Sequence, residues 1–366
     1  MKLRYKILSG FAAVIAIAVV ALALVLSHTN PCEPAPVASA GTETMKAIVY
    51  RCYGSPDVLT FEDIEKPAPA DEQVLVKVHA AAVNPYDWHH MRGSPYLMRL
   101  GIGLGNPKDI RLGSDFAGTV VEVGEGVTEF QPGDEVFGGA AGAYAEYAVA
   151  NTRSIARKPA SVSFEQAASL PIAAITALQA LRDHGQLQPG QKVLINGASG
   201  GVGTYAVQIA KSMGAEVHGV CSTRNVEMVR GLGADNVFDY KKEDYTQSGQ
   251  QFDLIVDMVS NHSLSANRDV LTPQGRYVIV GGAKGNWIAP LMGPLKAMVY
   301  SPFVDQHMGM MIATMDGADL AELATLMERG ELASKIDRRY PLSEVADAIR
   351  YSEEGRARGK IIIDLE

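Results

Sequence analysis

This sequence of 366 residues has few cysteines and no excess of positive charge. Its three cysteines, Cys32, Cys52 and Cys221, are odd in number and far apart. The sequence therefore predicts neither a disulfide framework nor a cysteine-rich zinc site, and it favours a fold kept in the reduced state. The net charge is −8 and the pI is near 5.6. Because phosphate backbones require a concentrated basic face, nucleic acid is excluded as an expected partner.

The stretch from residue 191 to residue 225 lacks the first glycine of the usual G-x-G-x-x-G fingerprint but keeps its context. Residues 193–195 read as a buried strand, and residues 202–213 carry apolar side chains at helical spacing. A glycine loop between a strand and a helix is typical of a dinucleotide site, since the pyrophosphate lies close to the backbone and faces the helix amides. An ordinary turn is the alternative. The residues expected at the cofactor phosphates are Ala198, which replaces the first glycine, Ser199, Gly200, Gly201, Val202 and Gly203.

No acidic residue follows the second strand of this unit. An enzyme that uses NAD usually carries Asp or Glu about 20 residues after the glycine loop, where it binds the ribose 2′-OH; a 2′-phosphate instead needs donors and positive charge. Here residues 216–221 are followed by Ser222, Thr223 and Arg224. The sequence therefore predicts NADPH as the cofactor, bound in part by Ser222 and Arg224. A solvated arginine at a helix start is the alternative for Arg224.

One long apolar run is present, at the N-terminus. Three basic residues precede residues 7–26, which are apolar apart from a Ser-Gly pair. At about 1.5 Å per residue the run spans roughly 30 Å, the thickness of a bilayer core. A cleaved signal peptide has an apolar core of only about 7 to 15 residues. We therefore expect residues 1–44 to form a single transmembrane helix and a flexible linker, with a cleaved signal peptide as the alternative.

The sequence leaves open the side of the membrane on which the remaining chain would lie. The positive-inside rule places Lys2, Arg4 and Lys6 in the cytoplasm, and no Lys or Arg follows the apolar run until Lys46. These charges predict an exterior location for the folded part. The need for NADPH, a cytoplasmic reductant, predicts the opposite.

Short strands with alternating apolar residues occupy the chain from residue 45 to residue 150, separated by Gly- and Pro-containing turns. Within this region, residues 95–113 carry apolar residues among glycines without a steady period. They are interpreted as the border of an apolar substrate site, as a membrane-contacting loop, or as a plain insertion.

Several stretches together make the sequence specific for one family. They include MKAIVY, AAVNPYDWHHMRG, LGSDFAGTVVEVGEGV, INGASGGVGTYAVQIAK and RGKIII. With these the chain resembles the medium-chain dehydrogenase/reductase superfamily, and within it the zinc-independent quinone oxidoreductase branch. The resemblance implies an α/β fold with two domains. Residues 45–168 and 305–366 form a GroES-like β-barrel catalytic domain, and residues 169–304, between these two parts in the sequence, form a Rossmann domain with a doubly wound parallel sheet.

The resemblance also implies that no metal is bound. Zinc-dependent members carry a Cys ligand where this sequence has Asn84, and Gly-His-Glu where it has Gly113, Ser114 and Asp115. A catalytic zinc needs about three protein ligands, and both ligand positions are lost. The adjacent His89 and His90 are read as a loop pair, not as ligands.

Other site residues follow from the same resemblance. It implies that Asn84 and Asp87 lie beside the nicotinamide, and an amide and a carboxylate flanking Pro85 form a rigid polar corner that can orient a ring. An Asx turn is the alternative. The resemblance further implies cofactor contacts at Thr176 and Tyr240, and at Arg358 and Lys360 in the final Gly-Lys segment, with Arg356 an open alternative there. Cofactor contacts are also expected at Gly281 and Gly282, which follow a predicted strand at the carboxyl edge where open α/β sheets bind ligands.

We predict an NADPH-dependent, zinc-independent oxidoreductase that transfers hydride to a quinone or an α,β-unsaturated carbonyl, with a proton from Tyr86, Tyr96 or water. The apolar N-terminus suggests a lipophilic acceptor taken from the membrane, and homodimers are common in the family. The alternatives are an enoyl thioester reductase, an alcohol/aldehyde oxidoreductase, and a membrane-tethered NADPH-binding redox sensor without turnover.

Overall fold

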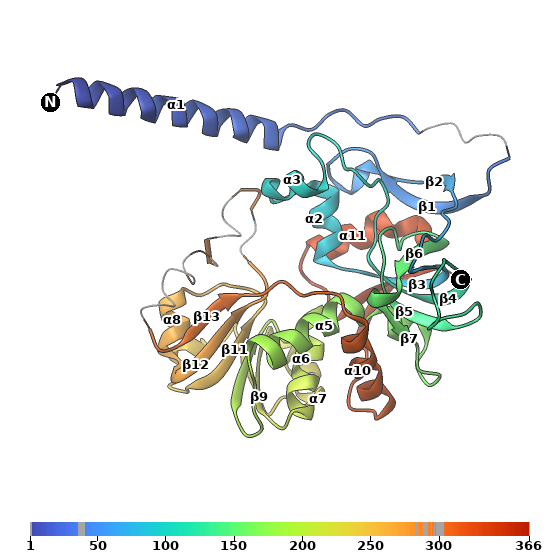
Figure 1. The fold of residues 1–366 in the computed structure, drawn as a ribbon. Helices are drawn as coiled ribbons and strands as arrows, with labels where there is room; N and C mark the ends of the chain where they lie inside the picture. Colours follow the sequence, from blue (N-terminus) through green and yellow to red (C-terminus); the bar gives the residue numbers. More distant parts are fainter. Residues whose placement is uncertain are drawn as a thin grey trace.

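The computed structural model describes residues 2–35, 41–282, 285–287, 292–293, 295, 297 and 304–365. In this part of the chain, a seven-stranded and a six-stranded sheet each form the centre of a domain, and a long N-terminal helix projects from the body (Figure 1). The α/β architecture with two domains is as predicted.

The first domain is built on the seven-stranded sheet, whose order is β14-β15-β3-β4-β5-β7, with β6 also paired to β3. Its strands are β3 (Gln73–Val83), β4 (Asp115–Val123), β5 (Glu135–Gly139), β6 (Tyr147–Asn151), β7 (Ile155–Arg157), β14 (Ile336–Pro341) and β15 (Lys360–Asp364), and a separate hairpin pairs β1 (Thr44–Tyr50) with β2 (Leu59–Glu65). β15 lies antiparallel to β3, with Ile361 opposite Val83. This register brings the C-terminal Lys360 beside Asn84 at the start of α2.

Helices of the first domain lie at the ends and sides of this sheet. They are α2 (Pro85–Arg92), α3 (Arg99–Ile102), α4 (Phe164–Ala168), α10 (Gly317–Glu328) and α11 (Val345–Glu353). α2 begins directly after β3, because Pro85 takes the first helical position, where a missing N–H costs nothing. His89 and His90 therefore lie in a helix, which corrects the loop predicted for them.

The second domain has a parallel sheet in the order β10-β9-β8-β11-β12-β13. Its elements are β8 (Lys192–Asn196), α6 (Gly201–Ser212), β9 (Glu216–Cys221), α7 (Val226–Gly231), β10 (Asn236–Asp239), β11 (Phe252–Asp257), α8 (Leu264–Asp269), β12 (Leu271–Ile279) and β13 (His307–Met310), with α5 (Pro171–Gln179) preceding them. β8 is buried on both faces, as its unbroken apolar sequence predicts. The order reverses between β8 and β11, so the crevice at their carboxyl ends is where such a sheet binds ligands.

The return of the chain to the first domain begins later than predicted. β13 pairs in parallel with β12, with His307 opposite Arg276 and Met310 opposite Ile279. Residues 307–310 thus complete the second sheet, and the boundary predicted at residue 305 lies before that strand. The crossing to the first domain follows Met310.

The transmembrane anchor predicted at the N-terminus is wrong. α1 (Lys2–Ser27) is helical, but no helix in the described part of the chain is long and apolar enough to cross a bilayer. Hydropathy alone also missed that the end of this helix takes part in the fold. Leu26 is buried against the first domain, and the Arg99 guanidinium donates hydrogen bonds to the carbonyl oxygens of Leu26 and His28.

A disulfide joins the N-terminal segment to the first domain, which corrects the prediction of unpaired, reduced cysteines. Cys32 and Cys52 are bonded, with their Cα atoms 4.7 Å apart, whereas Cys221 is free and buried. An odd count with wide spacing gave no sign of this pair, because the two residues meet only once β1 and the segment after α1 have packed together.

Candidate functional site

A cleft of about 1010 Å³ lies between the two domains, at the carboxyl ends of β8, β9 and β11. The first domain contributes Val83, Asn84 and Pro85 on one side, and the last strand contributes Lys360 and Ile361. The glycine loop forms the opposite wall. The cleft therefore lies where the strand order of the second sheet predicts a ligand.

The glycine loop is shaped for close approach by a ligand. The residue that takes the left-handed conformation is Gly197, with φ +96°, directly after β8. A Cβ on Gly203 would lie 2.1 Å from the Gly197 carbonyl oxygen and 2.7 Å from Ala198 Cα. Glycine at 203 is therefore required for α6 to pack on the loop. Ala198 is fully buried beneath the loop, so it is a packing residue and does not line the cleft.

The N-terminus of α6 opens onto the cleft. Gly200 is its N-cap residue, no acidic residue lies in its first turn, and residues 199–203 all line the cleft. Unpaired amides at a helix N-terminus attract phosphate oxygens. Ser199, Gly200, Gly201, Val202 and Gly203 thus form one wall of the cleft, and this wall fits a pyrophosphate.

Positive charge gathers in the cleft. Four cationic residues, Arg224, Lys241, Arg356 and Lys360, line it, and no Asp or Glu is among its described lining residues. Arg224 is exposed and donates a hydrogen bond of 2.8 Å to the Arg356 carbonyl oxygen. Tyr240, beside Lys241, is 54% exposed at the same cleft. This composition suits a ligand that carries several phosphates.

Asn225 is a cleft residue that the sequence did not indicate. It is 4% exposed, and its Nδ2 atom donates to the hydroxyl oxygens of Ser199 (3.0 Å) and Ser222 (3.3 Å). Its Oδ1 atom is buried and has no hydrogen-bond partner among the described residues. An unpaired buried acceptor is costly unless a ligand completes it. The amide thus connects the glycine loop to the end of β9 and leaves an acceptor for a sugar hydroxyl.

Five of the residues predicted to contact the cofactor do not line the cleft. The Thr176 hydroxyl donates 2.6 Å to the Ile172 carbonyl within α5, so it satisfies its own helix. The backbone amide of Arg358 donates a hydrogen bond to the Asp337 carboxylate. Its neighbours Arg356 and Lys360 line the cleft. Ala198, Gly281 and Gly282 are also absent from the lining residues. Gly281 packs against the backbone of Met258, which does line the cleft.

A buried polar network lies at the end of the cleft nearest the first domain. The Asn84 side chain donates 2.9 Å to Asp115 Oδ2 and accepts a hydrogen bond of 2.6 Å from Lys360 Nζ. Lys360 Nζ is also 3.4 Å from Asp115 Oδ2, and both side chains are almost completely buried. The Ile172 amide, in the first turn of α5, donates to Asp115 Oδ1. Burial raises the pKa of Asp115, and the Lys360 ammonium opposes that rise.

Asp87 is fully buried on α2 and is held from one side only. Its Oδ2 atom accepts hydrogen bonds from the backbone N–H of Asn84 (2.7 Å) and from the Tyr144 hydroxyl (2.8 Å). Its Oδ1 atom is buried without a partner in the described structure. Burial raises the pKa of Asp87 to about 7, although these two hydrogen bonds act against the rise.

A second cavity, of about 460 Å³, adjoins α2 and the loop predicted to border a substrate. Its lining includes Tyr50, Tyr86, Asp87, His90, Ile102, Leu112 and Met315. The charged side chains at its border are engaged, since Arg111 pairs with Asp109 and Lys108 donates to the Gly101 carbonyl. The size and lining of this cavity suit a compact, largely apolar molecule. Tyr96 is not among its lining residues; its ring instead meets Trp287 edge-on and lies against the Arg99 guanidinium.

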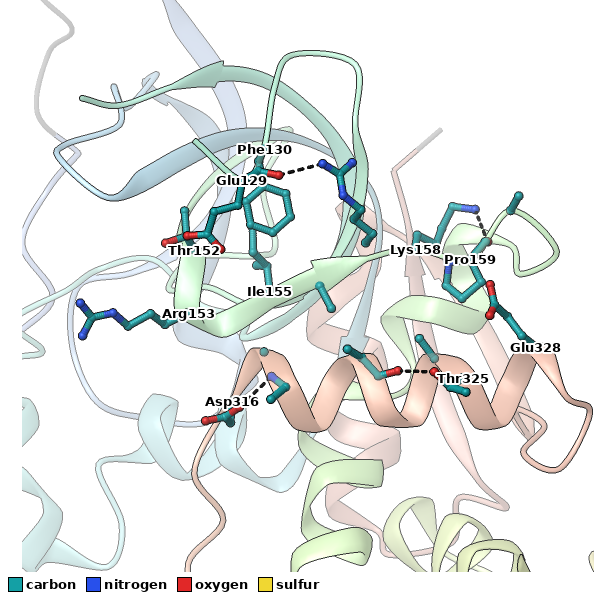
Figure 2. A pocket seen from close by; sticks show the side chains of 17 residues that line it. Glu129, Phe130, Thr152, Arg153, Ile155, Lys158, Pro159, Asp316, Thr325 and Glu328 are labelled. Carbon is teal, nitrogen blue, oxygen red and sulfur yellow. Dashed lines mark hydrogen bonds between the residues drawn. The ribbon is translucent and has the colours of Figure 1, made fainter. Parts of the chain in front are cut away.

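A third hollow, shown in Figure 2, lies between β7 and α10, away from the glycine loop. Two of its cations already have carboxylate partners, Arg157 with Asp134 and Lys158 with Glu135. It contains none of the residues predicted for the site.

No group of three or more His, Cys, Asp or Glu residues suited to a metal occurs in the described residues. His89 and His90 each use Nδ1 toward a backbone carbonyl, of Ser94 and Tyr86 respectively. Asn84, at one altered ligand position, and Asp115, next to the other at Ser114, instead have the Lys360 ammonium between them.

Comparison with known proteins agrees with this geometry. The family model described as alcohol dehydrogenase GroES-like domain matches residues 70–160, and the model described as zinc-binding dehydrogenase matches residues 232–363. The chain is 34% identical over 339 residues to the chloroplast envelope quinone oxidoreductase homolog of Arabidopsis thaliana, covering 87% of this chain and 98% of the relative. It is 32% identical over 334 residues to a 2-methylene-furan-3-one reductase of Solanum lycopersicum, covering 87% and 79%. The solved quinone oxidoreductase of Coxiella burnetii superposes with a TM-score of 0.78 at 31% identity, covering 88% of this chain and 100% of that structure.

Proposed function

We propose that the hydride donor of this protein is NADPH and that its acceptor is a small lipophilic molecule, since the chain belongs to the quinone-oxidoreductase-like branch of the medium-chain dehydrogenase/reductase superfamily. It is a nicotinamide-dependent oxidoreductase that reduces quinones or α,β-unsaturated carbonyls. A bound dihydronicotinamide supplies the hydride. The protein residues bind the nucleotide, hold its reactive ring near the acceptor, and supply a polar environment for the charge that develops on the acceptor oxygen.

The observation that carries the choice of NADPH is the charge of the cleft, which is lined by Arg224, Lys241 and Arg356 besides the paired Lys360, with no carboxylate among its described lining residues. An acid that would bind the ribose 2′-OH of NADH is missing after β9, where Ser222 and Arg224 lie instead. Arg224 presents a planar set of donors suited to a phosphate, and Arg356 and Lys241 add charge beside it. A 2′-phosphate is therefore the complementary group for this end of the cleft.

The proposed chemistry requires no zinc. The ammonium of Lys360 lies 2.6 Å from Asn84 Oδ1 and 3.4 Å from Asp115 Oδ2. A buried cation at these two positions already neutralises the carboxylate, and a divalent ion beside it would be repelled. Asn84 is thereby fixed at the border of the cleft, where it can orient a nicotinamide ring.

Replacing Arg224 by alanine tests the cofactor preference. A hydrogen bond to a charged group contributes about 1.5 to 3 kcal/mol, so the variant is expected to bind NADPH about 10- to 100-fold more weakly, with NADH affinity little changed. Isothermal titration of both nucleotides measures this. Arg268→Ala, at a partly exposed arginine of α8 outside the cleft, is the matched control and should behave as the unchanged protein. An equal loss for both nucleotides would contradict the assignment of Arg224 to the 2′-phosphate.

Turnover is tested with panels of naphthoquinones, enones, enoyl thioesters and aldehydes, by following NADPH oxidation. Reduction of quinones or enones in preference to aldehydes is expected. Tight NADPH binding with no turnover of any acceptor would instead support a redox sensor.

A further inference from the structure

Resting on the proposed function, we infer that Asp87 is the general acid of the reaction, and that its free Oδ1 atom delivers the proton to the reduced acceptor. Asp87 lines the smaller cavity, and the glycine-loop cleft begins at its neighbours Asn84 and Pro85. It thus lies where a molecule in the cavity and a ring in the cleft meet.

The two carboxyl oxygens of Asp87 differ in their hydrogen bonds. Oδ2 accepts from the Asn84 amide and from the Tyr144 hydroxyl, so two donors already point at it. A proton on Oδ2 would compete with both donors, and the proton of a neutral carboxyl therefore belongs on Oδ1. Oδ1 is the atom that lacks a partner in the described structure.

The surroundings of Asp87 favour a neutral carboxyl near neutrality. The groups packed around it are Tyr144 from the loop before β6, Asp115 from β4, Lys360 from β15, and Tyr86 and His90 on its own helix, with Tyr50 of β1 across the cavity. Burial is the largest influence and raises its pKa to about 7; the Asp115 charge also raises it, while Lys360 and the two hydrogen bonds lower it. An acid whose pKa lies near the working pH is well matched to proton transfer.

Other titratable groups of the cavity are less suitable donors. Burial raises the pKa of Tyr50 and of Tyr86, which makes both phenols weaker acids. Burial lowers the pKa of His90, so its ring is neutral near pH 7, and its Nδ1 atom is occupied by the Tyr86 carbonyl. Tyr86, predicted from sequence as a proton source, is half exposed and packs on the His90 ring. Asp87 is therefore a better proton donor than these three side chains.

The proposed step is balanced as follows. The acceptor gains two electrons with the hydride and becomes an anion, an enolate or a hydroquinone monoanion. The Oδ1–H bond of Asp87 breaks, its proton forms the new bond to that anion, and the electron pair stays on the carboxylate. The Tyr144 hydroxyl and the Asn84 amide stabilise this carboxylate through Oδ2. Water reprotonates Asp87 after the product leaves.

Asp87→Asn tests the proposal, because the amide oxygen can still accept both hydrogen bonds but cannot release a proton. We expect nucleotide affinity and melting temperature to change little and kcat to fall about 100-fold or more, within the range of general acid catalysis. In the unchanged protein, kcat/KM should fall as the pH rises through about 7, because the acid is then lost; this fall should be absent from the variant. Asp316→Asn, at the capping aspartate of α10, is the matched control and should keep full activity.

A readout without turnover separates this proposal from the proposed function. Infrared difference spectra of the protein alone, titrated across neutrality, should show a protonated carboxyl band that disappears in Asp87→Asn. Tyr144→Phe removes a donor that lowers the pKa of Asp87, so it should move both the band and the pH profile to higher pH. Undiminished kcat in Asp87→Asn, or an ionised Asp87 throughout this range, would overturn the role of Asp87 while leaving nucleotide binding intact. Failure of the unchanged protein to bind either nucleotide would instead refute the proposed function.

Discussion

Replacing Gly203 by alanine is expected to abolish nucleotide binding and to lower the melting temperature. The added methyl would lie 2.1 Å from the Gly197 carbonyl oxygen and under 3 Å from two backbone atoms of Ala198. Backbone cannot yield as the end of a side chain does, so α6 must move away from the loop, and overpacking of this kind costs about 1 to 3 kcal/mol or more. We expect affinity for NADPH to fall by at least about 100-fold, because the helix amides no longer face the pyrophosphate.

Gly231→Ala provides the control for this prediction. Gly231 is the last residue of α7, and a Cβ added there meets no atom within 4 Å. Its melting temperature should match or slightly exceed that of the unchanged protein, since alanine is the better helix former. The comparison uses thermal unfolding followed by circular dichroism, with nucleotide titration on both variants. A Gly203→Ala protein that binds NADPH normally would show that the loop does not carry the pyrophosphate.

Replacing Lys360 by methionine is expected to cause the largest loss of stability among single changes at the site. The ammonium is the only described cation within 4.0 Å of the Asp115 carboxylate, and both groups are buried. Removing one partner of a buried ion pair costs about 3 to 5 kcal/mol, which corresponds to a fall in melting temperature on the order of 5 to 10 °C. Asn84 also loses the donor on its Oδ1 atom, so nucleotide binding should weaken.

The pH dependence of this loss is specific to the buried pair. Burial raises the pKa of Asp115 while Lys360 holds it down, so without the lysine the native carboxyl keeps its proton to still higher pH. The unfolded chain releases that proton at lower pH, and the variant is therefore least stable, relative to the unchanged protein, at about pH 8 and recovers toward about pH 5. Adding Asp115→Asn to Lys360→Met should restore part of the stability at neutral pH.

An exposed ion pair is the control for this experiment. Arg230 pairs with Glu227 on the surface of α7, and Arg230→Met should change stability by no more than about 0.5 kcal/mol at either pH. A Lys360→Met protein as stable as this control at every pH would mean that Asp115 is neutral in the unchanged protein. The network would then be held by hydrogen bonds alone.

The sequence alone predicted those parts of the site whose residues are consecutive in the chain. The strand, glycine loop and helix from β8 to α6 are consecutive in the chain, so periodicity and turn residues predicted them, and Ser222 and Arg224 follow at the end of β9. The motif did not reveal which glycine takes the left-handed conformation. Gly197 does so, one residue before the alanine that replaces the first glycine.

The rest of the site depends on contacts that no short stretch contains. Lys360 meets Asn84 only because β15 pairs with β3, 276 residues away in sequence. Arg356 lines the cleft whereas Arg358 does not, and the backbone amide of Arg358 donates to Asp337; the Arg-Ala-Arg sequence cannot show this difference. Thr176 was a polar residue in an apolar helix, and its hydroxyl is used by that helix itself. The predicted anchor failed for a different reason, since no helix in the described part of the chain is long and apolar enough to cross a bilayer.

The central claim is that a nicotinamide nucleotide with a 2′-phosphate lies across the glycine loop, its phosphate end beside Arg224. Equilibrium titration of the purified full-length protein with NADPH and NADH, followed by nucleotide fluorescence, tests this most directly. The account predicts saturable binding of one nucleotide per chain, with NADPH at least about 10-fold tighter than NADH, the contribution of one charged hydrogen bond. Equal affinity for the two nucleotides, or binding of neither, would contradict it.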